Sequence, residues 1–193
     1  MMRPLLRNGF AVAVAALAGC ASPSTRGVGE YLDERSGSTL VVVATPLVFA
    51  RERTDVAAFA RDYATLVAVE ANNAGKYAEY LLLFRWSTVD KRMSPLPDPQ
   101  AGELLIQAEG REIDLKALAS APVDLSRRRQ LHAPETAEVV VHAYAVDMAT
   151  LIFIATSRTL AVRLPQETLT SPFSLWEDGR ASLAKFAKRA TGS

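Results

Sequence analysis

The two histidines are the residues of this chain best suited to acid–base catalysis or metal binding. His142 follows a β-branched run and shares one side of its expected strand with Tyr144, so a base or ligand in a pocket is one interpretation. We favour the other interpretation, a histidine hydrogen-bonded within a sheet. His132 lies near Glu135 in a segment of a different type. Zinc sites combine several His and Cys residues at short spacings, so we expect no metal site.

Motifs of the common enzyme and nucleotide-binding families are absent from the sequence. A nucleophile elbow reads Gly-x-Ser-x-Gly between a strand and a helix, and neither it nor a phosphate-binding glycine loop follows an expected strand. Glu109, Glu112 and Asp114 could supply a carboxylate pair for glycoside hydrolysis. We favour a solvated hairpin turn for these acids, and we expect no enzymatic activity and no cofactor.

Basic residues gather at Arg127–Arg129 and at Lys185, Lys188 and Arg189. Arginine binds phosphate well, so these clusters could contact lipid headgroups or an acidic partner. A solvated loop and a helix end that complements the helix dipole are the favoured interpretations. The whole chain has 22 basic and 21 acidic residues and a formal charge of +1. This balance provides no argument for nucleic acid as a partner, and we expect none.

Cys20, the only cysteine, follows an apolar segment near the amino terminus. Arg3 and Arg7 precede that segment, and residues 10–18 are apolar throughout. A basic start, a short apolar run and small residues before a cleavage site are typical of a secretory signal peptide. A bilayer span needs about 20 apolar residues, so residues 10–18 are too short for a transmembrane helix.

Residues Leu17-Ala18-Gly19-Cys20 resemble the lipobox of bacterial lipoproteins, and the resemblance covers residues 1–22. It implies removal of the signal peptide, residues 1–19, and attachment of acyl chains such as palmitate at Cys20. Each buried methylene contributes about 0.8 kcal/mol, so three chains would anchor the protein firmly. In this family, Ala21 in place of aspartate implies the periplasmic face of the outer membrane, with the inner membrane as an alternative. An ordinary signal peptide cut after Gly19, or a buried free cysteine, is the other interpretation.

Residues 20–193 suit a single domain that can bury a sizeable core. Loss of Arg3 and Arg7 changes the formal charge from +1 to −1. Acylation of Cys20 would leave no thiol for a disulfide. Ala21–Gly29 is small and polar with Pro and Gly, so we expect a lipidated cysteine and flexible tether over residues 20–30. Residues 31–193 would then form one periplasmic domain, unless the tether packs against it.

The firmest strand prediction is a hairpin of Asp62–Ala71 and Tyr77–Thr88. Between them, Asn72, Asn73 and Gly75 tolerate the positive φ of a tight turn. The second strand alternates with a period of two, which is typical of a strand. Its apolar side has Tyr80, Leu82, Phe84 and Trp86, with Leu81 and Leu83 as exceptions on the other side. We expect these aromatic residues in the core and Tyr77 exposed.

Other strands are predicted by short β-branched and apolar runs. Pro46 divides Thr39–Ala50 into two segments with a kink. A second hairpin is expected over residues 103–115, with Glu109-Gly110 near its turn. Further strands are expected at residues 138–146, 159–164 and 171–176, and loops at 91–102 and 121–135.

Two segments have helical spacing. Asp147 can cap a helix whose apolar positions are Met148, Leu151, Ile152 and Ala155, although a strand is the alternative there. An amphipathic C-terminal helix is expected from Glu177 to Arg189, with an apolar stripe of Leu183, Phe186, Ala187 and Ala190. These patterns predict a mostly antiparallel α+β fold built from hairpins, with one or two helices. A β-sandwich is the alternative.

These observations favour a membrane-anchored bacterial lipoprotein that acts as a non-catalytic accessory or binding subunit of the cell envelope. Its partners would be the membrane, through acyl chains on Cys20, and an envelope protein. The alternative is a periplasmic carrier or sensor of a small apolar ligand, which would need an apolar cavity.

Overall fold

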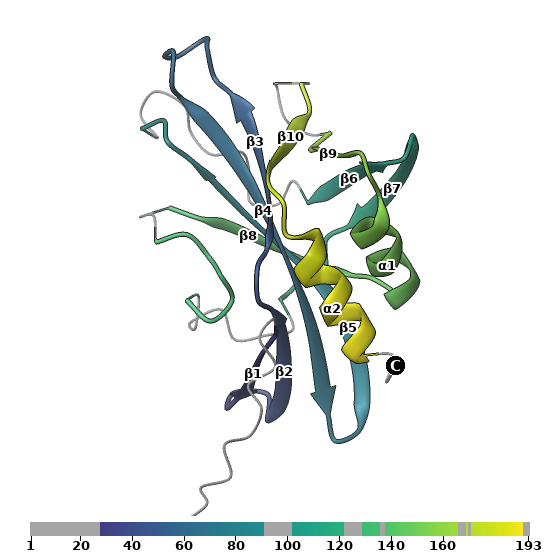
Figure 1. Cartoon of the computed structure of the whole chain (residues 1–193). Helices are drawn as coiled ribbons and strands as arrows, with labels where there is room; N and C mark the ends of the chain where they lie inside the picture. Colours follow the sequence, from purple (N-terminus) through teal and green to yellow (C-terminus); the bar gives the residue numbers. More distant parts are fainter. Residues whose placement is uncertain are drawn as a thin grey trace, which may run out of the picture.

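The computed structural model describes residues 28–90, 102–121, 129–135, 138–165, 169 and 171–190. Within these ranges the chain forms strands with one helix between β8 and β9 and another at its C-terminal end (Figure 1). In chain order the elements are β1 (Val28–Asp33), β2 (Ser38–Val43), β3 (Leu47–Glu52), β4 (Arg61–Asn73), β5 (Lys76–Ser87), β6 (Glu103–Ala108), β7 (Arg111–Lys116), β8 (Val140–Ala145), α1 (Met148–Thr156), β9 (Leu160–Arg163), β10 (Phe173–Glu177) and α2 (Arg180–Ala190).

The long β4–β5 hairpin lies at the centre of the sheet, where β4 pairs with β2 and β3 and β5 pairs with β8. The predicted turn is confirmed, and the Gly75 N–H donates to the Asn72 side chain over 2.8 Å. Positive φ falls on Ala74 and Gly75, however, rather than on Asn72 or Asn73. Strand β2 pairs with the second half of β4 and β3 pairs with the first half. The chain passes from one half to the other at Pro46, which confirms the predicted kink. The predicted second hairpin is confirmed as β6 and β7.

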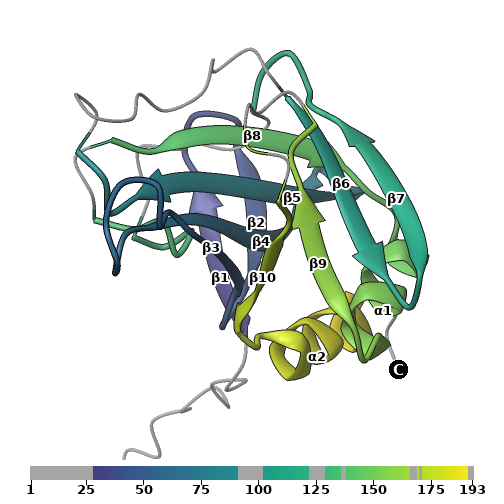
Figure 2. The same ribbon diagram turned by 90° about the horizontal axis from the view of Figure 1, so that it is seen from above.

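The described strands form one antiparallel network that curves strongly (Figure 2). From β4 the order runs through β3, β10, β9 and β6 to β7 on one side, and through β5 to β8 on the other. The curvature brings the two ends together, because the Leu118 N–H, just beyond β7, donates to the Ala143 carbonyl of β8 over 2.8 Å. A mostly antiparallel sheet with two helices, one of them C-terminal, is therefore confirmed.

The hydrophobic core lies on the concave face of this sheet. Directly paired residues share a face, and the register places these buried side chains on one face: Phe49, Leu66, Ile106, Val162 and Phe173. The opposite face of β4 and β5 is buried as well. Leu81 and Leu83, paired with Ala68 and Leu66, lie on the concave core face. Leu82 and Phe84 lie on the other face and are buried too, because strands covered on both faces have continuous apolar runs.

Both helices lie over the lower part of the sheet in Figure 1 and contact each other. Asp147 caps α1 as predicted, accepting the Thr150 N–H over 2.7 Å. The expected apolar stripe was partly wrong, because Ile154 is buried and Ile152 is 42% exposed. In the described ranges, neither helix is long and apolar enough to cross a bilayer.

The C-terminal helix is also confirmed, but it begins at Arg180 rather than at Glu177. Glu177 ends β10, and the Asp178 carboxylate accepts the Arg180 N–H over 3.0 Å. Leu183, Phe186 and Ala187 form its buried stripe, whereas Ala190, expected in that stripe, is exposed.

Strand β1 was not predicted. It begins at Val28 and pairs with β2, so residues 28–30 are strand rather than tether. The predicted loop at 91–102 lies outside the described residues except for Gly102, and so does most of the expected tether.

Candidate functional site

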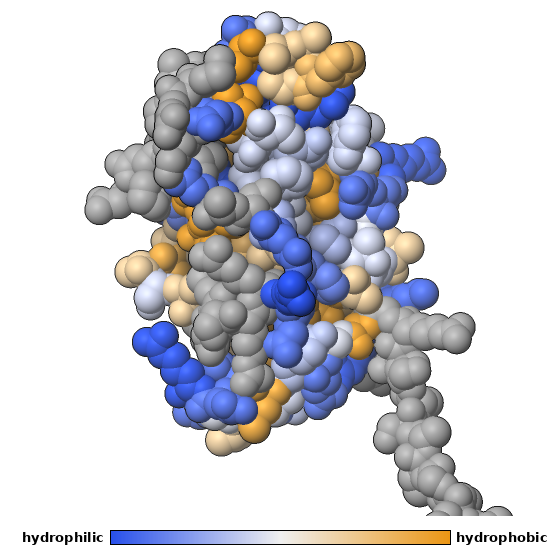
Figure 3. All heavy atoms as spheres, turned by 90° about the vertical axis from the view of Figure 1, so that its left-hand side faces the viewer, coloured by the Kyte–Doolittle hydropathy of each residue, from blue (hydrophilic) through white to orange (hydrophobic). Residues whose placement is uncertain are grey.

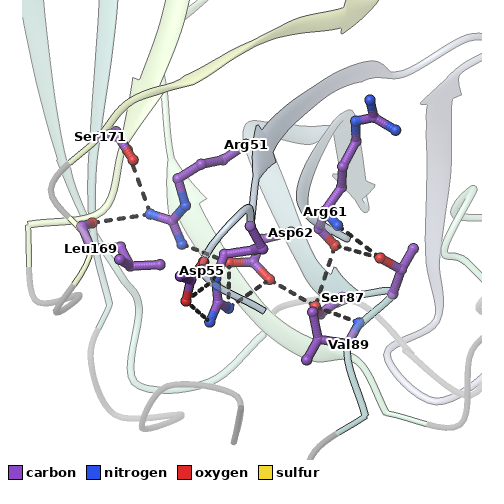
Figure 4. Close-up of polar contacts among 10 residues, drawn as sticks. Arg51, Asp55, Arg61, Asp62, Ser87, Val89, Leu169 and Ser171 are labelled. Atoms are coloured by element: carbon purple, nitrogen blue, oxygen red, sulfur yellow. Dashed lines mark hydrogen bonds and ion pairs between the residues drawn. The ribbon is translucent and has the colours of Figure 1, made fainter. Parts of the chain in front are cut away.

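Buried charged side chains join three neighbouring strands at the upper end of the sheet. We call Arg51, Arg53, Asp55, Asp62 and Ser87 the arginine–aspartate cluster (Figure 4). Asp62 of β4 lies directly between Arg51 of β3 and Ser87 of β5. Its carboxylate accepts hydrogen bonds from Arg51 Nη2 over 2.8 Å and from the Ser87 hydroxyl over 2.7 Å. The cluster therefore links β3, β4 and β5 on the concave face.

The same cluster anchors the connection between β3 and β4. Arg53 donates to Asp62 over 3.2 Å and to Asp55 over 3.0 Å. These hydrogen bonds lower the pKa of Asp55 and raise that of Arg53. Arg51 also donates to the Leu169 carbonyl over 3.0 Å, and its guanidinium carbon lies 4.2 Å from the centre of the Phe173 ring. Because the carboxylates are held as ion-pair acceptors, the arrangement suits a rigid support rather than proton transfer.

An aromatic group occupies the opposite face of the same strands. Residues 61 and 63 flank Asp62, and alternation along a strand turns their side chains to the other side. We call Arg61, Tyr63, Trp86 and Trp176 the aromatic cluster. The Tyr63 and Trp86 rings stack with centres 4.0 Å apart, and Trp176 meets Tyr63 edge-on at 6.4 Å. The guanidinium of Arg61 lies 4.7 Å from the centre of the Trp176 ring.

Trp176 is the exposed member of the aromatic cluster, with 53% of its surface accessible. Its position depends on a bulge in β10 between Leu175 and Glu177, where the register with β3 shifts. The neighbouring β3–β4 connection carries Phe59, which is 85% exposed. Figure 3 shows hydrophobic residues projecting at the end of the molecule where Figure 1 has this connection. The upper end therefore combines exposed aromatic rings with an arginine on a rigid support.

Further polar groups lie on the concave face below the arginine–aspartate cluster. Arg85, His142 and Tyr144 are all buried there. Burial lowers the pKa of Arg85 to about 10 and raises that of Tyr144 above its ordinary value. His142 thus lies in a sheet on the same face as Tyr144, as expected, with ring centres 6.5 Å apart.

His132 lies in a separate half-buried setting, where it hydrogen bonds with the backbone of Val43 and burial lowers its pKa. His132 lies in the segment 129–135, whereas His142 lies in β8, so the two histidines do not share an element. Across the described residues, no group of three His, Cys, Asp or Glu side chains is placed to hold a metal ion. Cys20 lies outside the described residues, as do Arg127 and Arg128.

The expected acidic turn is exposed and has structural partners. Glu109 accepts the backbone N–H groups of Arg158 and Thr159, which lower its pKa. Glu112 pairs with Arg163 at 2.8 Å. A groove of about 370 Å³ lies beside this turn, lined by Gln107, Gly110, Arg111, Glu112, Thr159, Leu160 and Ala161. Its partly charged lining does not suit a small apolar ligand.

Two of the basic residues singled out in the sequence form ion pairs in the structure. Arg129 is exposed and pairs with Glu135 at 2.9 Å, and Arg189 pairs with Glu30 at 2.8 Å. Phe84 is buried and Tyr77 is 63% exposed, as predicted.

Sequence reasoning missed Trp176 and the arginine–aspartate cluster. The pair Arg51 and Arg53, spaced by two after an apolar strand, was a usable signal for one charged face. Their partner Asp62 emerges only from the register of β3 with β4, and the exposure of Trp176 emerges only from the bulge. No protein-family model, curated protein or solved structure matches this chain, so its function has to be inferred from its own residues.

Proposed function

We propose that this protein is a bacterial envelope lipoprotein that binds a partner protein through the aromatic cluster and performs no chemistry itself. Acyl chains on Cys20 hold it at the periplasmic face of the outer membrane. The observation that carries the binding role is the exposure of Trp176 beside Tyr63, Trp86 and Arg61. Trp, Tyr and Arg are the residue types that contribute most of the binding energy in protein interfaces.

Rigidity supports this role. Binding is stronger when few side chains lose freedom on association. Tyr63 and Trp86 are stacked on each other, and Trp86 Nε1 also donates to the Thr65 hydroxyl over 3.4 Å. The arginine–aspartate cluster holds the strands beneath them. The cluster would therefore meet a partner with its rings already in place.

We also propose to place the fold in the α+β class rather than among β-sandwiches. The described strands belong to one hydrogen-bonded network, and α2 packs against β1, β2 and β4 of it. A sandwich would have two separate sheets packed face to face. An experimental structure that divides the strands between two such sheets would contradict this assignment.

The binding role can be tested by photo-crosslinking in the native bacterium. A photoreactive phenylalanine analogue replaces Trp176 in the full-length protein, and a matched variant carries it at Ile152. Ile152 is a suitable control because it is 42% exposed but lies on α1. We expect a protein adduct from position 176 that is absent from position 152. Identical adducts from both positions, or none from position 176, would contradict the role.

A binding measurement with the captured partner then gives the size of the effect. Trp176→Ala is expected to weaken its affinity by at least about tenfold, because interface hot spots typically cost 2 kcal/mol or more. Ile152→Ala is expected to leave the affinity unchanged.

Lipid attachment needs its own test. Denaturing mass analysis of the protein from membranes should give a chain that starts at Cys20 and carries acyl chains. Cys20→Ala should release the protein from the membrane fraction. If this variant still fractionates like the wild type, the anchor is wrong.

A further inference from the structure

Four residues form an open row across the lower end of the sheet. Leu32 pairs with Thr39, Thr39 with Asn72, and Asn72 with Tyr77. Directly paired residues share a face, so this row, which we call the tip row, runs across β1, β2, β4 and β5 on the concave side. Leu32 is 56% exposed and Tyr77 is 63% exposed. The row therefore presents an aliphatic and an aromatic side chain to solvent.

Helix α2 ends just before the tip row. The next row toward the centre contains Glu30, Val41, Glu70 and Glu79. Arg189, in the last turn of α2, pairs with Glu30 of that row at 2.8 Å. Figure 1 shows the β1–β2 turn, the β4–β5 turn and the C-terminal end of α2 toward the same end of the molecule. The helix thus covers the second row and leaves the tip row open.

Basic side chains lie in both turns at this end of the sheet and on α2, which ends beside the tip row. Arg35 is exposed in the β1–β2 turn, and Lys76 is exposed at the start of β5. Lys185 and Lys188 are exposed on α2. Each basic residue near an anionic lipid surface strengthens binding by about fivefold.

The acids near the tip row are less exposed than these basic residues. Asp33 is buried and accepts hydrogen bonds from the Arg35 N–H and the Ser36 hydroxyl. Glu30 is paired with Arg189. The basic side chains are the more exposed ones in the described part of the chain, because two of the five acids, Asp33 and Glu70, are buried, whereas all five basic residues reach solvent: Arg35, Lys76, Lys185, Lys188 and Arg189. Tyrosine, leucine and basic residues together are typical of a membrane–water interface.

The length of chain between Cys20 and β1 limits which end of the sheet can lie against the membrane. Seven residues lie between Cys20 and Val28, and the eight steps from one to the other span at most about 27 Å. Val28 lies opposite Val43, and β1 then runs about 17 Å to the tip. The distance to the other end of the sheet is longer. Val69 of β4 pairs with Val42, the neighbour of Val43, and β4 runs roughly 26 Å from Val69 back to Arg61. The chain can therefore reach past the tip, whereas the end that carries Phe59 is at the limit of its reach.

We infer that the tip row and the basic residues around it rest on the anionic headgroups of the membrane. This inference rests on the proposed acylation of Cys20. It gives the two ends of the β4–β5 hairpin separate roles, because the tip row contacts lipid while the aromatic cluster points away from the membrane toward the partner protein.

The test uses the full-length acylated protein in vesicles of phosphatidylethanolamine and phosphatidylglycerol. Cys20 is the only cysteine and would be acylated, so an introduced cysteine is the only free thiol. Lys76→Cys places a fluorescent label beside the tip row, and Phe59→Cys places the matched label at the opposite end. Nitroxide lipids in the vesicles quench labels that lie at the headgroups. We expect several-fold stronger quenching at position 76 than at position 59.

Flotation of the vesicles separates the possible outcomes. If the protein does not float with the vesicles, the anchor itself is wrong, and with it the proposed function. If it floats but the label at position 76 is no more quenched than that at position 59, the membrane-facing tip is overturned. In the Lys76→Cys protein, Arg35→Glu should reduce quenching, whereas the matched change Arg158→Glu, on an exposed residue beyond α1, should not. Equal effects of the two changes would also overturn the inference.

Discussion

Arg51 and Asp62 are direct partners across β3 and β4, and their side chains also form an ion pair of 2.8 Å. Only 6% of the Arg51 side chain and 15% of the Asp62 side chain are exposed. The Asp62 carboxylate also pairs with Arg53 and accepts a hydrogen bond from the Ser87 hydroxyl. The Asp62 carboxylate therefore pairs with two buried guanidinium groups, of which Arg53 also pairs with Asp55, and it links the ends of three strands.

Asp62→Ala should be strongly destabilising. Removing one partner of a buried ion pair typically costs about 3–5 kcal/mol, because the remaining charge loses its compensation. Urea unfolding followed by tryptophan fluorescence would measure the loss. Arg163→Gln is the matched control, because it breaks the exposed Arg163–Glu112 pair and should cost about 1 kcal/mol or less. Similar losses for the two variants would contradict the support role of Asp62.

Glu70 makes stability depend on pH. It is 8% exposed and faces Glu79 across β4 and β5. Burial, and then the nearby Glu79 and Glu30, raise its pKa above the ordinary 4.5, while Arg189 opposes the shift. The folded chain thus holds a proton that the unfolded chain has released, so this contribution falls as pH rises above about 4.5 through the raised pKa.

Glu70→Gln should therefore raise stability at neutral pH by about 0.2–1 kcal/mol, the usual range for a like-charged cross-strand pair. The gain should shrink as the pH falls toward 4.5, because the raised pKa of the wild-type carboxyl makes it bind its proton there. Urea unfolding at several pH values would measure both effects. Glu135→Gln, at an exposed position, is the matched control and should not raise stability at neutral pH. A Glu70→Gln protein with the same slope as the wild type would refute the assignment.

The local elements of the fold could be predicted from the sequence, because local signals determine them. Asn72 and Gly75 specify the turn of the β4–β5 hairpin, and Asp147 marks the start of α1. Pro46 marks the crossover between β2 and β3. In contrast, β1 contains two exposed residues, Glu30 and Leu32, and Gly29, so its short polar sequence has no clear strand period. It is a strand because β2 offers it a free edge.

Long-range features could not be predicted, because they depend on register. Leu81 and Leu83 looked like exceptions to an alternating pattern, and only the register shows that they face the concave core while Leu82 and Phe84 are buried on the other face. The candidate site also depends on strand register. Asp62 meets Arg51 through strand pairing, and Trp176 joins Tyr63 through the bulge in β10.

The capping role of Asp147 can be measured directly. Its carboxylate accepts the Thr150 N–H over 2.7 Å, and hydrogen bonds from the Thr150 side chain and backbone lower its pKa. Asp147→Ala should cost about 0.5–2 kcal/mol, as loss of an N-cap usually does, whereas Asp147→Ser should cost little. Thermal unfolding of the three proteins would show the order wild type, Ser variant, Ala variant. An Ala variant as stable as the Ser variant would exclude the capping contribution.

Gly179 joins the start of α2 to the crossover between β2 and β3. It is buried, and a Cβ atom there would lie 2.2 Å from the Pro46 carbonyl oxygen and 2.6 Å from that of Thr45. Both are backbone atoms, so no side chain can move aside. The same junction is held by the Thr45 N–H, which donates to the Ser182 hydroxyl over 3.0 Å. Gly179→Ala must therefore push α2 away from Pro46.

This displacement should cost about 1–3 kcal/mol or more, the usual range for overpacking a tight site. Gly37→Ala is the matched control. Its Cβ would meet no atom within 4 Å, and the φ of +68° adds backbone strain of about 1 kcal/mol. Urea unfolding should rank the wild type above Gly37→Ala, and Gly37→Ala above Gly179→Ala. Because α2 also covers the row beside Leu32 and Tyr77, hydrogen exchange in β1 should accelerate in Gly179→Ala alone. Equal exchange in the two variants would mean that α2 does not depend on its contact with Pro46.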